Sequence, residues 1–282
     1  MQSPSPLRLA GSAIFPLIIM LNGCSAHTAA STAAIPALPG QVIDVRATEF
    51  SFDAPETIPA GLTTFRLEQT GLVVERIRAG MQGQALVSDQ GDNSRGLHML
   101  WVVRLDDGKM ITDLLDAARA KLPTPWAHIV GGPGFILPPR TTNATMVLEA
   151  GNYALVCYVG SGRANETRYH LLHGMVRTLV VAPSSNSTTL PTAHTIARVT
   201  APGVVEFSKP LQSGSQLIRV DNKTARDIEF TFLQKGGIGF GGLSSVPSGA
   251  TVMTTIVFVP GEYSVRTGFG AQHVPIAFTI AN

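Results

Sequence analysis

Charged side chains are scarce in this sequence. Asp, Glu, Lys and Arg make up 14% of its 282 residues, and the formal net charge is only +2. Because there is no basic cluster to neutralise phosphates, nucleic acid is excluded as a partner. The sequence also lacks a Ser/His/Asp set or a carboxylate pair in a catalytic arrangement, so we expect the protein not to be an enzyme.

Residues 1–23 have the features of an export signal. Arg8 is followed by an apolar run from Leu9 to Leu21 and then by Asn22-Gly23-Cys24. The run is well below the roughly 20 residues that a membrane-crossing helix needs, which favours a cleaved signal peptide. Leu21-Asn22-Gly23-Cys24 resembles the bacterial lipobox, and this resemblance implies cleavage and lipidation at Cys24. An ordinary secretory signal with an unrelated cysteine is the alternative.

Lipidation would hold the chain outside the cytoplasm on a bacterial membrane. Ser25, in place of Asp, follows the cysteine. By resemblance to the lipoprotein sorting rule, this implies the outer membrane of a Gram-negative cell, facing the periplasm or the cell surface. Residues 24–40 are mostly Ala, Ser, Thr and Pro after the cysteine, a composition typical of a flexible tether.

Cysteine is rare, since only Cys24 and Cys157 occur. If Cys24 carries lipid, Cys157 has no disulfide partner, although the compartment would permit a disulfide. A lone thiol in an oxidising space is a liability unless it is buried or bound to something. Cys157 is therefore the residue whose role most needs an explanation.

Glycine and proline, by contrast, are plentiful, at 28 and 19 residues. They recur about every 8 to 12 residues between short runs rich in Val, Ile, Thr and Phe, which is typical of an all-β sandwich. Apolar residues at helical spacing predict one helix over residues 111–121. Strands are predicted over residues 42–47, 63–69, 98–105, 145–148, 153–158 and 176–181.

Similar sequence motifs occur on either side of a Ser/Thr/Pro-rich linker at residues 183–195. Gly151-Asn152-Tyr153 is echoed by Gly261-Glu262-Tyr263, and two further pairs of motifs occur in the same order. Echoes in one order indicate a duplicated unit. We therefore predict two tandem Greek-key β-sandwiches over residues 41–182 and 196–282, with the helix inserted into the first.

The first predicted sandwich resembles the cupredoxin, or blue-copper, family. The resemblance lies in His98 at the start of a strand, in a strand ending at Cys157, and in the segment His170-Leu171-Leu172-His173-Gly174-Met175. It implies that His98, Cys157, His170 and Met175 bind a single copper ion. A soft thiolate, two imidazoles and a weak thioether suit an ion that cycles between two oxidation states.

The spacing of the closing ligands departs from the family pattern. Residues 158–169 separate Cys157 from His170, whereas the cupredoxin loop is short and tight. Both ends of the longer loop can still meet at one metal, because each doubling of a flexible loop costs only about 0.6 kcal/mol. His173, which lies closer to Met175, is the alternative ligand to His170.

The second predicted sandwich lacks this ligand set, because the repeat places Thr267 where Cys157 stands. We expect it to be metal-free. The leading hypothesis is a membrane-anchored, extracytoplasmic copper protein for electron transfer or copper handling, with a redox protein as partner. The alternative is a non-metal binding or structural module at the cell envelope. A copper-dependent oxidase or reductase is less favoured, because it needs further His-rich centres and the chain has seven histidines.

Overall fold

A computed structural model of the protein describes residues 37–48, 50–70, 98–135, 141–160, 169–235, 238–268 and 275–281. The predicted signal peptide, Cys24 and most of the predicted tether lie outside these residues. Within the described part of the chain, no helix has the length and apolarity required to span a bilayer.

Strands dominate the described residues, which confirms the predicted all-β sandwich class. The strands of the first half alternate buried and exposed positions where one face meets the core, as in β1. The first nine strands are β1 (Gln41–Thr48), β2 (Ser51–Asp53), β3 (Thr57–Pro59), β4 (Gly61–Gln69), β5 (Trp101–Leu105), β6 (Ala127–Gly131), β7 (Thr141–Leu148), β8 (Gly151–Val156) and β9 (Val176–Ala182). The others are β10 (Thr195–Ala201), β11 (Val204–Phe207), β12 (Gly214–Asn222), β13 (Ile228–Gln234), β14 (Ile238–Val246), β15 (Thr251–Phe258), β16 (Gly261–Thr267) and β17 (Ile276–Ile280).

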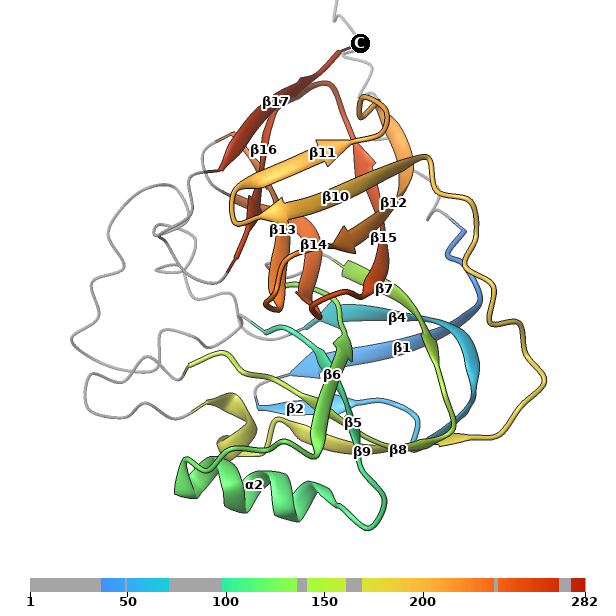
Figure 1. The fold of residues 1–282 in the computed structure, drawn as a ribbon, viewed down its shortest axis with the longest axis vertical. Helices are drawn as coiled ribbons and strands as arrows, with labels where there is room; N and C mark the ends of the chain where they lie inside the picture. Colours follow the sequence, from blue (N-terminus) through green and yellow to red (C-terminus); the bar gives the residue numbers. More distant parts are fainter. Residues whose placement is uncertain are drawn as a thin grey trace, which may run out of the picture. The chain divides into compact units, whose positions relative to one another are not determined.

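The predicted helix is present as α2 (Ile111–Ala120). Leu114 on its inner side is buried against apolar residues of β5 and β8, so α2 covers the outer face of their sheet (Figure 1). The helix ends at Lys121, where the backbone N–H groups of Lys121 and Leu122 donate to the carbonyls of Ala118 and Ala117. A short 3-10 helix, η1 (His170–His173), lies between β8 and β9 and contacts α2.

The described strands form three sheets. One has the order β3-β9-β8-β5-β6, a second has the order β14-β13-β16-β17, and an eight-stranded sheet runs β11-β10-β12-β15-β7-β4-β1-β2 through both halves of the chain. Buried apolar residues of both halves pack into one core. The halves therefore share a sheet and a core.

Strand pairing in the second half follows that in the first. β1 pairs antiparallel with β2 and parallel with β4, and β10 pairs in the same two ways with β11 and β12. The hydroxyls of Tyr153 and Tyr263 each donate to a backbone carbonyl four residues upstream, at 2.9 Å. The matching registers put Ile228 and Thr267 at the positions of His98 and Cys157. The domain boundaries at residues 41–182 and 196–282 stay a prediction.

Side chains reinforce the junction between β7 and β15. The strands share the register pair Thr145–Met253. The amide group of Asn143 both donates to the carbonyl of Thr255 and accepts from its N–H, each at 2.8 Å. The Ser244 hydroxyl also donates to the carbonyl of Leu100 at 2.6 Å. The second half thus holds the segment that leads into β5, next to the site described below.

Candidate metal centre

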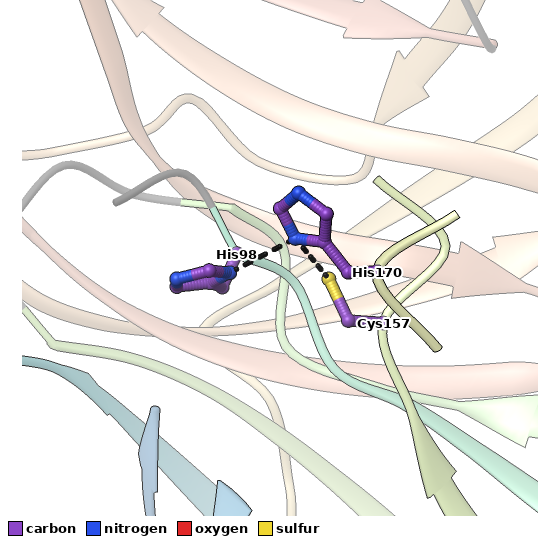
Figure 2. Close-up of side chains that lie close together, drawn as sticks. All are labelled: His98, Cys157 and His170. Carbon is purple, nitrogen blue, oxygen red and sulfur yellow. Dashed lines mark hydrogen bonds between the residues drawn. The ribbon is translucent and has the colours of Figure 1, made fainter. Parts of the chain in front are cut away.

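Three of the predicted ligands, His98, Cys157 and His170, lie close together in the structure (Figure 2). His98 precedes β5, Cys157 follows β8 and His170 begins η1. The Nδ1 atoms of the two histidines are 3.2 Å apart, and the Cys157 Sγ lies 3.6 Å from the His170 Nδ1. Each of the three side chains is 0% exposed. The structure therefore collects one thiol and two imidazoles in a site closed to water.

Backbone hydrogen bonds close the long gap between Cys157 and His170. Gly160 and Tyr169 form an antiparallel bridge. Just inside it, the His170 N–H donates to the Val159 carbonyl at 2.8 Å. The N–H of Leu171 then donates to the Cys157 carbonyl at 3.0 Å. The ends of the loop are thus paired, so its unusual length does not separate the two side chains.

Met175 joins the two closing ligands through its backbone. Its N–H donates to the His170 carbonyl at 3.0 Å, and its carbonyl accepts from the Cys157 N–H at 3.1 Å. The Met175 side chain is buried and belongs to the same apolar core as Cys157. The backbone of Met175 is therefore fixed beside Cys157 and His170, and its thioether as a ligand stays a prediction.

His173 is placed differently from His170. Among the described residues, the three-donor group contains His170 and not His173. The His173 ring lies against that of Phe50, with centroids 5.3 Å apart. Its Nε2 atom is buried without a hydrogen-bond partner in the described part of the chain. Of the two alternatives, His170 is the one that the fold brings to Cys157.

Gln69 holds His98 in place, a role that sequence reasoning missed. Its side-chain oxygen accepts from the His98 N–H at 3.2 Å, and its amide nitrogen donates to the His98 carbonyl. Gln69 is fully buried at the end of β4. A glutamine ending a predicted strand was the available signal, because a buried amide must find partners.

Burial sets the protonation of the thiol. Removal from water raises the pKa of Cys157 to about 12, and weaker effects of hydrogen bonds with the Met99 and Val159 backbone act in the opposite direction. Burial disfavours the thiolate, which is the form that attacks electrophiles and binds metals. Without a metal, Cys157 is a protonated and unreactive thiol at neutral pH. Any bound metal has to displace that proton.

The donor set fits copper. Thiolate sulfur and imidazole nitrogen are ligands that suit a soft-to-borderline transition metal, and a single thiolate with two imidazoles suits copper. A hydrogen bond between the two facing Nδ1 atoms requires that one ring carries its hydrogen on Nδ1 and that the other ring accepts there. A metal bound to both Nδ1 atoms would require the first ring to carry its hydrogen on Nε2, which frees the second lone pair. The group of His98, Cys157 and His170 could therefore bind one copper ion.

No protein-family model and no curated protein matches the sequence. Among solved structures, reduced auracyanin from the photosynthetic bacterium Roseiflexus castenholzii matches 51% of this chain and 98% of its own, at 16% identity and a TM-score of 0.31. A multicopper oxidase matches 87% of this chain and 92% of its own, at 12% identity and a TM-score of 0.27. A copper-containing nitrite reductase from Thermus scotoductus SA-01 matches 85% and 61%, at 9% identity and a TM-score of 0.22. Because the identities and TM-scores are low, no functional argument is drawn from these structures. The functional argument rests on the side chains of the site.

Proposed function

We propose that this protein is a membrane-anchored, extracytoplasmic, cupredoxin-like protein that holds one copper ion through His98, Cys157 and His170, with Met175 as a weak fourth ligand. Its role is electron transfer or copper handling. The observation that carries this proposal is the meeting of a thiol and two imidazoles, with ligand atoms within 4.8 Å of one another, in a fully buried site. When bound, copper supplies one-electron exchange between two oxidation states.

The chain's own residues prepare this site. Gln69 holds the backbone of His98, and the hydrogen bonds among Cys157, His170 and Met175 hold the other ligands. Such supporting contacts orient ligands and strengthen metal binding. The packed core around the site excludes water and limits any rearrangement of the ligands.

Burial favours electron transfer or copper handling over catalysis. A catalytic metal keeps a coordination position open to substrate. Here all three donor side chains are 0% exposed, and the described residues contain one such group of donors. We accordingly infer that the protein is not an enzyme and that its partner is another redox or copper-carrying protein.

The anchor and the second sandwich complete the proposal. Leu21-Asn22-Gly23-Cys24 and the Ala/Ser/Thr/Pro-rich tether support lipid attachment at Cys24. The second sandwich is a degenerate copy of the first, and Ile228 and Thr267 at the positions of two ligands support a metal-free role for it. That role is to complete the shared core.

Copper titration of residues 26–282 tests the proposal. We expect an intense visible band from a copper–thiolate bond and a higher melting temperature, since a ligand specific for the folded state stabilises it by about 2.7 kcal/mol at a hundredfold excess over Kd. Cys157→Ser should lose the band, whereas His128→Ala, at an exposed histidine, should keep it. Absence of both the band and the stabilisation in the unmodified protein would contradict the proposal.

A further inference from the structure

A pocket with a volume of about 380 Å³ lies between the C-terminal half of α2 and the segments next to the candidate ligands. Tyr158, which follows Cys157, and Tyr169, which precedes His170, both line it. The pocket is separate from the metal centre, whose three donors are not among its lining residues. Pockets that hold small molecules begin at about 300 Å³, so one ligand with one or two fused rings fits this volume.

The walls of the pocket combine leucine and tyrosine side chains with polar groups such as Thr124. The rings of Tyr158 and Tyr169 meet edge to face, with centroids 5.6 Å apart and planes at 75°. Leu114 is buried at the inner wall, while Leu122 and Tyr169 at the mouth are 61% and 44% exposed. Leucine and tyrosine side chains left in water around a concave site are what a bound ring would cover.

Among the described residues that line the pocket, Lys121 is the charged one. It ends α2 with φ +54°, a left-handed conformation that favours glycine. No described carboxylate pairs with its ammonium group, in contrast to Lys109 just before α2 and Arg119 within it, which pair with Asp113 and Asp116. The helix C-terminus contributes only about half a negative charge, so the full charge of Lys121 gives the part of this wall that α2 forms a net positive charge.

We propose that this pocket binds a small aromatic carboxylate, whose ring packs against Tyr158 and the leucines and whose acid group pairs with Lys121. Leucine and tyrosine side chains beside a lysine, as the described lining residues provide them, favour a flat ring that carries one negative charge. Neutral rings lose the ion pair, and aliphatic acids lose the contacts with the tyrosines. This inference concerns the pocket alone and does not depend on copper binding.

Calorimetric titration of the full, metal-free chain tests the ligand class with 2-naphthoate and its neutral analogue 2-naphthamide. Partly exposed ion pairs contribute up to about 1 kcal/mol, so we expect 2-naphthoate to bind about fivefold more tightly at low salt. This preference should shrink as salt is added. Equal affinities for the two probes, or no binding of either at millimolar concentration, would overturn the proposal.

Three variants locate the binding. Lys121→Gly suits the positive φ and should remove the preference for 2-naphthoate, while Lys121→Arg should retain it. Ala118→Phe places a ring in the pocket from the pocket-facing side of α2 and should weaken both probes at least tenfold. Arg119→Ala, next to it but outside the lining, is the control for folding and should leave both affinities unchanged. Unaltered binding by a folded Ala118→Phe variant would exclude this pocket.

Because every measurement uses metal-free protein, failure of the copper proposal would leave this result untouched.

Discussion

The ring of Phe50 meets the ring of His170 edge-on, with centroids 4.9 Å apart and planes at 89°. Phe50 lies between β1 and β2 with φ +57°, and it shares this positive φ only with Lys121 among the described residues other than glycine. A bulky residue held in such a conformation often marks a functional site, because the surrounding contacts must compensate for the strain. We infer that Phe50 shields the buried imidazole of His170.

Phe50→Ala should open the metal centre to small reagents. We expect Cys157 of the metal-free variant to react with a disulfide reagent about tenfold faster, because exposure lowers the cost of forming the thiolate. The rate is measured by absorbance at pH 8. Phe207→Ala removes a similarly half-buried ring from the second half and should leave the rate unchanged. A rate equal to that of the unmodified protein would show that Phe50 is not the shield.

The raised pKa of Cys157 predicts a stability that falls in alkaline solution. Burial raises the pKa of the folded-state thiol to about 12, above the ordinary thiol value of 9.0. The stabilisation is therefore complete below about pH 9 and is lost as the pH rises towards 12. Between those values the free energy of unfolding should fall by up to about 1.4 kcal/mol per pH unit. Urea unfolding of the metal-free protein at pH 8, 9 and 10 measures this slope.

Cys157→Ser is the control, since its hydroxyl does not titrate in this range. In this variant the free energy of unfolding should fall less steeply between pH 8 and pH 10, because the contribution of the thiol is absent. Parallel pH profiles for the two proteins would mean that the folded protein accommodates the thiolate, contrary to its burial.

The same proton couples copper affinity to pH. Because Cys157 must lose its proton to become a ligand, the apparent copper affinity should rise about tenfold per pH unit between pH 7 and pH 9. Competition with a chelator of known affinity measures the change, and calorimetry in buffers of different ionisation enthalpy counts the released proton. A flat profile would indicate that the thiol is not a ligand.

Gln69→Ala should weaken copper binding through His98. The substitution leaves a buried N–H and carbonyl of His98 without their side-chain partner, which costs about 1–3 kcal/mol of stability. Loss of a supporting contact also typically lowers metal affinity about 10- to 100-fold. Thr64→Val removes another buried hydrogen bond, to Thr145, and should cost stability without lowering affinity. Equal affinity losses in both variants would assign the effect to general destabilisation.

Asn143→Ala should loosen the junction of the two halves. The variant loses two hydrogen bonds between β7 and the Thr255 backbone, so we expect it to lower the free energy of unfolding by about 1–3 kcal/mol. Hydrogen exchange should rise first at β7 and β15. Ser215→Ala on the exposed end of β12 is the control. Unchanged hydrogen exchange at both strands would mean that the backbone pairing at Thr145 and Met253 is enough to hold β7 and β15 together without the Asn143 side chain.

Part of this site could be predicted from the sequence, because its ligands follow or precede local patterns. Cys157 closes an apolar strand, and His170 opens a short segment ending at Met175. The position of Gln69 at a strand end indicated that its amide needs partners, but it could not identify His98 as the partner, since the two are distant in sequence and their contact depends on the packing of two sheets. Nor does the length of the loop after Cys157 reveal that its ends are paired by backbone hydrogen bonds.

The fold was predictable to a similar degree. Alternating apolar residues and punctuating glycines indicated the strands, and the helix was predicted to within one residue of its observed end. The strand predicted over residues 98–105 begins only at Trp101, because Gln69 and Pro133 hold the backbone of residues 98–100. The pairing between β7 and β15 could not be predicted from any local sequence pattern, since it joins segments from opposite halves of the chain.

Because the two halves share a sheet and a core, the metal centre cannot be separated from the second half without loss of supporting contacts. Cutting the chain in residues 183–195 would remove the strand that pairs with β7 and the Ser244 hydroxyl that satisfies Leu100. The severed half would present an open strand edge, to which other chains readily add. A designer who wishes to graft this site onto another protein would have to transfer residues 37–281 as one piece.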